Sequence, residues 1–184
     1  MIKNTKNHYG WITIVFHWLV ALVVIGLFIL GYWMVDLGYY DDWRKAGPAL
    51  HKSIGLTLFA LMLLTVIFRR TQIQPSALNN YKSYEIKSAH LMHIFLYILI
   101  FLIMISGYLI STADGRGIDY FQFFVVPGFG SMVDNQEDSA GLFHKYAAYT
   151  LIIMVFLHTL AALKHHFIDK DITLLRMLGK RTNR

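Results

Sequence analysis

The segment LFHKYAAYTLIIMVFLHTLAALKHHF, residues Leu142–Phe167, joins the length and apolarity of a membrane span to two histidines, His144 and His158. A helix needs about 20 apolar residues to cross a bilayer. The fourteen-residue spacing of the histidines is almost four turns of ~3.6 residues, so both imidazoles leave one face of the helix, roughly 21 Å apart along its axis. This helix can therefore hold two stacked metal centres. The alternative is that each imidazole hydrogen-bonds to a neighbouring helix.

The composition predicts an integral membrane protein. Of its 184 residues, 56% are hydrophobic and 15% are charged, and the mean hydropathy is +0.47. The absence of cysteine excludes disulfides, thiolate haem ligands, covalent c-type haem attachment and cysteine-ligated iron–sulfur clusters. A transition metal must then be held by histidine. The net charge of +6 comes from basic residues beside apolar spans, where they set orientation and contact anionic membrane lipid, so no nucleic-acid partner is expected.

Four apolar segments predict an all-α fold, an integral membrane four-helix bundle in a single membrane domain over residues 1–184. The predicted spans are residues 11–35, 50–68, 88–110 and 142–167. The first is too long for a signal peptide and lacks its cleavage site, so we expect it to be retained. Gly47 and Pro48 predict a turn before the second span. The Gly-rich, acidic stretch 111–140 predicts an ordered cap with a short amphipathic segment.

The lysines and arginines set the expected orientation. Most of the 17 lie in the N-terminal segment, in the loop between the second and third spans, and in the tail after the fourth span. The first and third loops hold only Arg44, Lys45 and Arg116, with Lys52 and Lys145 at the adjoining helix starts. By the positive-inside rule, both termini and the middle loop face the cytoplasm.

This topology sorts four histidines into two level pairs. His51 and His144 begin their spans at the outer surface, whereas His17 and His158 lie nearer the inner ends of theirs. Two neutral imidazoles on opposite sides of a macrocycle make a six-coordinate haem suited to electron transfer, and two haems divide the ~30 Å of hydrocarbon into shorter steps. A zinc or copper site would need several ligands at one depth. A purely structural four-helix protein and a transporter remain open alternatives.

Several of these positions also have a plainer interpretation. His17 and His51 could anchor helix ends at the membrane interface. Gly55, one turn after His51, leaves room for a flat ligand but could equally pack two helices together. His90 and His93 share a face at the start of the third span, where interfacial or hydrogen-bonding roles are favoured over axial ligation.

A set of motifs resembles the bacterial cytochrome b561 family over essentially the whole chain. They are FHW at His17, HKSIGL at His51, SAHLMH at His90, HKY and LHTLAALKHHF in the last span, and the tail DKDITLLRML. Cytochrome b subunits of membrane hydrogenases share the two-histidine last helix, so that feature alone indicates only the wider superfamily. Thr65 departs from the pattern, because many relatives carry an arginine there and a second arginine at the position of Arg69.

The resemblance implies two non-covalent b haems and a location in the bacterial inner membrane. The axial iron ligands would be His17 with His158 towards the cytoplasm and His51 with His144 towards the periplasm, and Gly55 and Gly107 would pack against haem. Members pass electrons to the quinone pool, and one type is a superoxide oxidase, which takes electrons from periplasmic superoxide and reduces ubiquinone. The resemblance therefore implies a superoxide:ubiquinone oxidoreductase. The alternative is an electron-relay subunit between another redox protein, such as a periplasmic one, and the quinone pool.

Charged and titratable residues near the two surfaces are candidates for the remaining roles. At the outer surface, Lys52, Lys145 and Arg116 predict a cationic funnel for superoxide, although the lysines could simply snorkel at helix starts. At the inner surface, quinone reduction needs protons, and imidazoles titrate near neutral pH. The candidate quinone contacts or proton relays are His90, His93, His165, His166 and Arg69, with interfacial snorkelling as the alternative.

Overall fold

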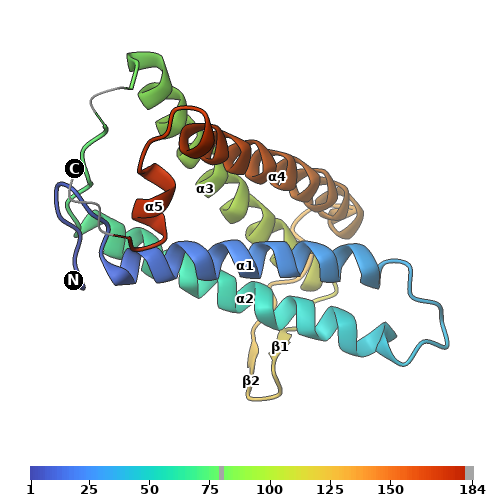
Figure 1. Cartoon of the computed structure of the whole chain (residues 1–184). Helices are drawn as coiled ribbons and strands as arrows, with labels where there is room; N and C mark the ends of the chain where they lie inside the picture. Colours follow the sequence, from blue (N-terminus) through green and yellow to red (C-terminus); the bar gives the residue numbers. More distant parts are fainter. Residues whose placement is uncertain (79–80, 181–184) are drawn as a thin grey trace. The chain divides into compact units, whose positions relative to one another are not determined.

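The computed structural model describes residues 1–78 and 81–180, most of which are helical (Figure 1). Four long helices dominate, with a short β-hairpin between the third and fourth and a short helix after the fourth. In chain order the elements are α1 (Trp11–Met34), α2 (Trp43–Arg70), α3 (Ser83–Ser111), β1 (Ile118–Tyr120), β2 (Phe124–Val126), α4 (Gln136–Phe167) and α5 (Thr173–Met177). The last part of the predicted basic tail, residues 181–184, lies outside the described residues.

The helices α1 to α4 are all long and apolar enough to cross a membrane, with mean hydropathies of 2.7, 1.8, 2.5 and 1.8 in their most apolar windows. Many of their large apolar side chains are exposed, among them Leu22 at 66%, Leu64 at 57% and Ile153 at 58%. In water such a surface would aggregate, whereas in hydrocarbon it is the expected outer face of a helix. The predicted four membrane-spanning helices are therefore confirmed, while the orientation of the termini stays a prediction.

Helix α2 begins at Trp43, earlier than the predicted start at residue 50, and runs through Pro48. The turn expected at Gly47 and Pro48 is therefore wrong. Pro48 is the sixth residue of α2, beyond the four positions whose N–H groups lack an intrahelical partner, so it costs the helix one backbone hydrogen bond, to the carbonyl of Arg44. The early turn is also packed, because a Cβ placed on the buried Gly47 would lie 3.5 Å from the Cβ of Met34.

Helix α4 likewise begins before its predicted span, at Gln136 instead of residue 142. The Gln136 side chain is 5% exposed. Its Nε2 donates to the Leu109 carbonyl at 3.0 Å, and its Oε1 accepts from the Met132 backbone N–H at 2.9 Å. This polar anchor fixes the first turn of α4, so the helix extends beyond its apolar part.

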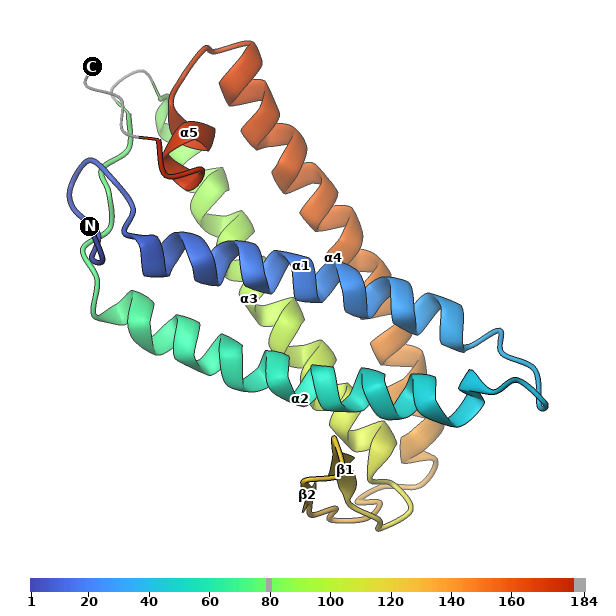
Figure 2. The same cartoon turned by 60° about the horizontal axis from the view of Figure 1, so that its bottom comes forward.

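The cap between α3 and α4 contains a β-hairpin, which the sequence did not predict (Figure 2). Strands β1 and β2 are antiparallel, with Ile118 opposite Val126. Phe121 and Gln122 have φ values of 47° and 64°, as a tight hairpin turn of type I′ requires. Ser53 of α2, 2% exposed, holds this turn by donating to the Asp119 carbonyl at 3.2 Å and accepting from the Phe121 N–H at 3.1 Å.

The chain divides into two compact units, each containing a part of all four long helices. Unit 1 comprises Met1–Ala21, Leu61–Leu96 and Ile153–Arg184, and unit 2 comprises Leu22–Ala60 and Tyr97–Ile152. Inside unit 1, Phe16 of α1 packs edge-on against Phe68 of α2. The single-domain organisation expected from the sequence stays a prediction.

Candidate metal centres

Unit 2 brings together His51 of α2 and His144 of α4. Their imidazole centroids lie 6.3 Å apart, with the ring planes at 68°. Both residues are half-buried. The apolar run around each keeps the segment helical through the histidine, and helical geometry then directs the ring sideways from the axis towards the neighbouring helix. The sequence-based pairing of these two residues thus corresponds to a close approach in space.

His144 is held by the backbone of α3. Its Nδ1 lies 2.9 Å from the Ile103 carbonyl and 3.1 Å from the Ser106 hydroxyl, which itself donates to the same carbonyl at 2.9 Å. A carbonyl only accepts hydrogen bonds, so Nδ1 carries the proton and Nε2 keeps a lone pair. This is the tautomer that a metal-ligating histidine needs, and the partner of Nδ1 fixes the orientation of the ring.

A glycine from an adjacent helix stands behind each ring of this pair. A Cβ on Gly31 of α1 would lie 3.1 Å from the Cε1 of His51, and a Cβ on Gly107 of α3 would lie 3.2 Å from the Cε1 of His144. Gly107 was singled out from the sequence, but Gly31 was not. Gly55, by contrast, has no atom within 4 Å of an added Cβ, so space is open beside α2.

Unit 1 brings together His17 of α1 and His158 of α4. Their ring centroids are 6.4 Å apart at 59°, and the Trp18 ring stands edge-on to His17 at 5.4 Å. A third imidazole, that of His93 from α3, lies 5.1 Å from His158. Unit 1 therefore holds a cluster of three rings, whereas unit 2 holds a pair.

The two separations of 6.3 and 6.4 Å suit a metal ion between the rings. A metal–imidazole bond of about 2.0–2.1 Å, with about 1.2 Å more from the ligating nitrogen to the ring centre, gives about 6.4 Å for two rings on opposite sides of one ion. The pair His93–His158 at 5.1 Å is too close for that arrangement. Four imidazoles in two pairs, in a sequence without cysteine, thus fit bis-histidine ligation of b haem, and no atom lies within 4 Å of a Cβ added at Gly55.

The other residues of unit 1 that the sequence singled out differ in exposure and in what they contact. His90 is exposed, and the half-buried ring of His166 packs edge-on against Phe167 at 4.8 Å. Arg69 is exposed at the end of α2. Thr65 donates from its hydroxyl to the Leu61 carbonyl at 2.7 Å.

His165 sits in a polar network that the sequence did not reveal. Its Nδ1 is 2.7 Å from Asp169 and 3.5 Å from Asp171, distances for an ion pair when the ring is protonated, although neither contact is aligned as a hydrogen bond. The Tyr81 ring lies 4.7 Å from His165, and its hydroxyl donates to Asp171 at 2.7 Å and contacts Thr173. Burial raises the pKa of Tyr81 above its ordinary range, so this hydroxyl stays protonated.

Three side chains near the end of α4 bring their possible ligand atoms within 4.8 Å of one another, close enough to hold a metal ion. They are Glu85, His165 and Asp169. The ammonium of Lys164 already contacts Glu85 at 3.3 Å and Asp169 at 2.6 Å. The hydrogen bond from Lys164 also lowers the pKa of Asp169. A cation of the chain itself thus neutralises these carboxylates, and the group is an ion-pair network.

The predicted outer cations all belong to unit 2 and are exposed. Arg116 is paired, with its Nη2 2.5 Å from Asp114, and 87% of its side chain is exposed. The hydrogen bond from Arg116 lowers the pKa of Asp114, and the charge of Lys52 adds a smaller effect in the same direction. Arg116 therefore contributes little net charge, which leaves Lys52 and Lys145 as the main cations of the three.

Comparison with known proteins extends over nearly the whole chain. Residues 8–180 match the family model described as prokaryotic cytochrome b561. The chain is 47% identical over 177 residues to cytochrome b561 homolog 2 of Escherichia coli strain K12, covering 96% of this chain and 94% of the relative. It is 28% identical over 179 residues to a Yersinia pestis protein named probable superoxide oxidase CybB, covering 94% and 97%. Cytochrome b561 homolog 1 of the same E. coli strain is also 28% identical, with 97% of each chain covered.

Proposed function

Because the chain belongs to the prokaryotic cytochrome b561 family of b-type haem electron-transfer proteins of the membrane, we propose that it is a dihaem superoxide:ubiquinone oxidoreductase. The observation that carries the proposal is the presence of two histidine pairs, one in each unit, at ring separations of 6.3 and 6.4 Å. The superoxide part rests on the name of the Yersinia relative and on exposed cations in the unit that holds His51 and His144.

The four histidines act in two pairs. His17 and His158 would hold one haem b, and His51 and His144 would hold the other, while Gly107 lets the backbone of α3 approach His144 closely. Haem held by two imidazoles would supply a one-electron couple suited to electron transfer over oxygen binding. The Ile103 carbonyl keeps the His144 ring in the ligating tautomer.

In the net reaction, two superoxide anions lose one electron each and leave as two oxygen molecules. One ubiquinone takes up the two electrons and two protons and becomes ubiquinol. Lys52 and Lys145, both exposed on unit 2, raise the encounter rate with the anion. Among the described residues, the imidazoles of unit 1 are the groups suited to bring protons to the quinone.

The proton donors are drawn from the unit 1 histidines. His93 lies against His158, so it can serve a quinone near the haem of that unit. His165 has Asp169, Asp171 and Tyr81 beside it, so titratable and polar groups surround this imidazole. His90, His166 and Arg69 are further candidate contacts for the quinone head group. In the bacterial inner membrane this unit faces the cytoplasm, as the positive-inside rule predicts.

A stopped-flow experiment tests the proposal directly. Purified protein is mixed with superoxide and a soluble ubiquinone analogue, and haem reduction and quinol formation are followed by absorbance. We expect reduction with a rate constant near ~10⁸ M⁻¹s⁻¹ and one quinol per two superoxide anions. Reduction no faster than in a sample containing free haem would exclude the superoxide activity.

A double variant, Lys52→Gln with Lys145→Gln, separates steering from chemistry. We expect a slower reaction with superoxide and a weaker dependence on ionic strength, because fewer cations attract the anion. The haem spectrum should not change. A rate and a salt dependence equal to those of the wild type would show that these lysines only snorkel at the membrane surface.

A second candidate function is an electron-relay subunit that takes electrons from another redox protein. It is favoured by exposed apolar side chains in the cap, including Phe123 at 83% and Phe129 at 77%, which offer a docking surface. The E. coli relative at 47% identity carries a cytochrome name without a stated activity. Slow reduction by superoxide, together with fast reduction by a periplasmic donor protein, would select this function.

A further inference from the structure

The N-terminal segment of unit 1 is folded back over the start of α1. Asn4 is 7% exposed, and its Oδ1 accepts hydrogen bonds from the Gly10 N–H at 2.7 Å and the Thr13 hydroxyl at 2.8 Å. The Met1 carbonyl accepts from the Trp11 N–H at 3.1 Å. The segment therefore forms a loop with a defined conformation.

The C-terminal segment lies against the same end of α1. The Trp18 Nε1 donates to the Met177 carbonyl at 2.8 Å, at the end of α5. Arg176 donates from Nη1 to the Ser76 carbonyl at 3.0 Å, which ties α5 to the segment after α2. Gly179 has φ of +74°, a backbone conformation that favours glycine. It lies close to the Trp11 ring, since a Cβ added at Gly179 would be 3.8 Å from it.

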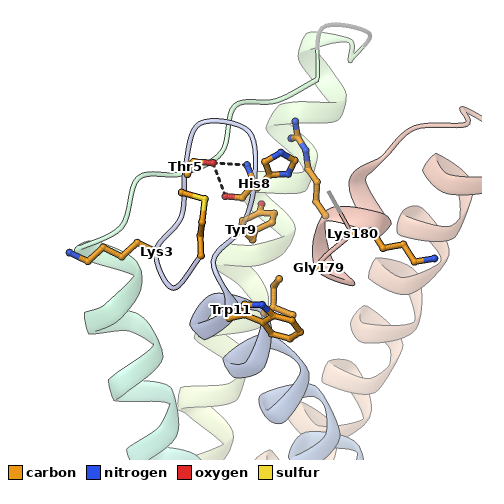
Figure 3. A pocket seen from close by; sticks show the side chains of 10 residues that line it. Lys3, Thr5, His8, Tyr9, Trp11, Gly179 and Lys180 are labelled. Carbon is orange, nitrogen blue, oxygen red and sulfur yellow. Dashed lines mark hydrogen bonds between the residues drawn. The ribbon is translucent and has the colours of Figure 1, made fainter. Parts of the chain in front are cut away.

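A small cavity of about 30 Å³ lies between these two segments (Figure 3). Its lining includes Lys3, His8, Arg176 and Lys180, and none of its ten lining residues carries a carboxylate. In Figure 3 the Thr5 side chain is hydrogen-bonded to the backbone of His8 at one edge, and Trp11 lies below. The cavity is thus lined by cations without an acidic counterpart.

Arg176 has a buried donor that is left without a partner. Its Nε is buried and has no hydrogen-bond partner, although Nη1 is satisfied. Within residues 1–78 and 81–180, Lys3, Arg176 and Lys180 form no ion pair with an acidic side chain. A buried guanidinium donor that is left unpaired loses its hydration without compensation, so an anion in the cavity would be strongly favoured.

We propose that this cavity binds the phosphate group of an anionic phospholipid, with Arg176 as its buried donor and with Lys3 and Lys180, whose side chains extend to opposite sides in Figure 3, as positive charges at its rim. Arginine and lysine are the side chains that bind phosphate best, and basic pockets at the membrane surface bind lipid head groups. A volume of about 30 Å³ is close to that of one water molecule, so the cavity admits one phosphate oxygen, while the rest of the phosphate group and the lipid chains would remain outside. Trp11, at the start of α1, is 59% exposed and marks the level of the membrane interface. The lipid chains would therefore lie at that level, outside the cavity.

Native mass spectrometry of the purified holoprotein tests the site, with phosphatidylglycerol, phosphatidylcholine and inorganic phosphate as the probes. We expect phosphatidylglycerol to bind in preference to phosphatidylcholine. The variant Lys3→Gln with Lys180→Gln should weaken that binding about 30-fold, from about 1 kcal/mol for each lost charge. Arg176→Gln should weaken it as well, by removing the donor next to the phosphate.

A matched control is Arg70→Gln with Lys87→Gln, which removes two exposed cations of the same unit that do not line the cavity. It should bind phosphatidylglycerol as the wild type does. A second outcome is that the wild type binds inorganic phosphate but no phosphatidylglycerol, and that the cavity variants lose this phosphate binding. That result would support the anion site and identify free phosphate as its ligand. The proposal is overturned if the Lys3/Lys180 variant, with an unchanged haem spectrum, binds phosphatidylglycerol and phosphate like the control.

Discussion

The histidines of unit 1 and unit 2 share a ring separation but differ in what surrounds them. In unit 2, His144 is fixed by the Ile103 carbonyl, and glycines stand directly behind both rings of its pair. In unit 1, His17 and His158 have a third imidazole and a tryptophan beside them, and His165 with its neighbouring carboxylates lies further along α4.

This difference teaches that two imidazoles can be held at the same separation in two ways. Backbone groups and glycines hold the unit 2 pair, so its geometry depends on how closely the helices approach. Titratable side chains surround the unit 1 pair, as a site that exchanges protons requires.

The largest effect is expected from removing a ligand of either pair. His144→Ala should lower the haem content from two to one per chain and spare the unit 1 haem, because no other described imidazole adjoins His51. His158→Ala should remove the haem of unit 1 in the same way. The measurement is the haem-to-protein ratio from the pyridine haemochrome spectrum, with electron paramagnetic resonance to identify the haem that remains. Retention of both haems in either variant would contradict the ligand assignment.

Next in size is the third imidazole of unit 1. His93→Gln should keep both haems, because its ring at 5.1 Å from His158 is too close for the two to ligate one iron from opposite sides. Quinone reduction should slow by about a hundredfold, the usual size of a general-acid contribution. Turnover with a ubiquinone analogue measures this effect. Loss of a haem would instead identify His93 as a ligand.

A smaller effect is expected from the glycines of unit 2. Gly31→Ala places a Cβ 3.1 Å from the His51 ring, and overpacking of this kind costs about 1–3 kcal/mol, so the affinity of that haem should fall roughly tenfold. Haem titration of the apoprotein measures it. Gly26→Ala is the matched control on the same helix, because nothing lies within 4 Å of its added Cβ. Equal effects of the two variants would show that helix α1, and not the ring contact, is responsible.

A finer test concerns the Ser106 hydroxyl, 3.1 Å from the His144 Nδ1. Ser106→Ala removes one acceptor for the imidazole proton and makes the ring a weaker base. The potential of the unit 2 haem should rise by about 20–65 mV, the equivalent of one hydrogen bond of about 0.5–1.5 kcal/mol. A redox titration should show the other haem unchanged. A shift in both haems, or in the unit 1 haem alone, would contradict this local role.

The smallest effect is expected at the ion pair Arg116–Asp114. Because Arg116 lowers the pKa of Asp114, the carboxylate stays ionised and cancels the guanidinium until the pH falls below 3.8, the ordinary value of aspartate. Asp114→Asn should therefore free the Arg116 charge and raise the rate with superoxide about twofold at low salt. Arg116→Gln should lower it slightly. Identical rates at low and high ionic strength in both variants would exclude steering at this pair.

The family and the four spans could be predicted because their signals lie within single segments. A histidine in an apolar helix is rare, and the helical period shows which ones share a face, so His144 and His158 stood out. The family predicted from the motifs is confirmed by the match over residues 8–180. The haem ligands, the quinone contacts and the orientation in the membrane stay predictions.

The remaining features depend on how separate segments meet. Gly31 is one of several span glycines, and only the approach of α2 distinguishes it from Gly26. The hairpin was missed because its turn, at Phe121 and Gln122, lacks the usual glycine or asparagine and is instead held by Ser53 from another helix. The carbonyl of Ile103 carries no signal at all, because every residue has one.

The indole of Trp18 links the end of α5 to an imidazole. Its ring stands edge-on to His17 at 5.4 Å, while its N–H is bonded to the Met177 carbonyl. A chain shortened before Met177 would leave that indole free to rotate and would disturb His17 from a distant point in the sequence. Affinity tags and fusion partners are therefore better placed in the cap between α3 and α4 than on a trimmed C-terminus, if the spectrum of the haem assigned to His17 is to be preserved.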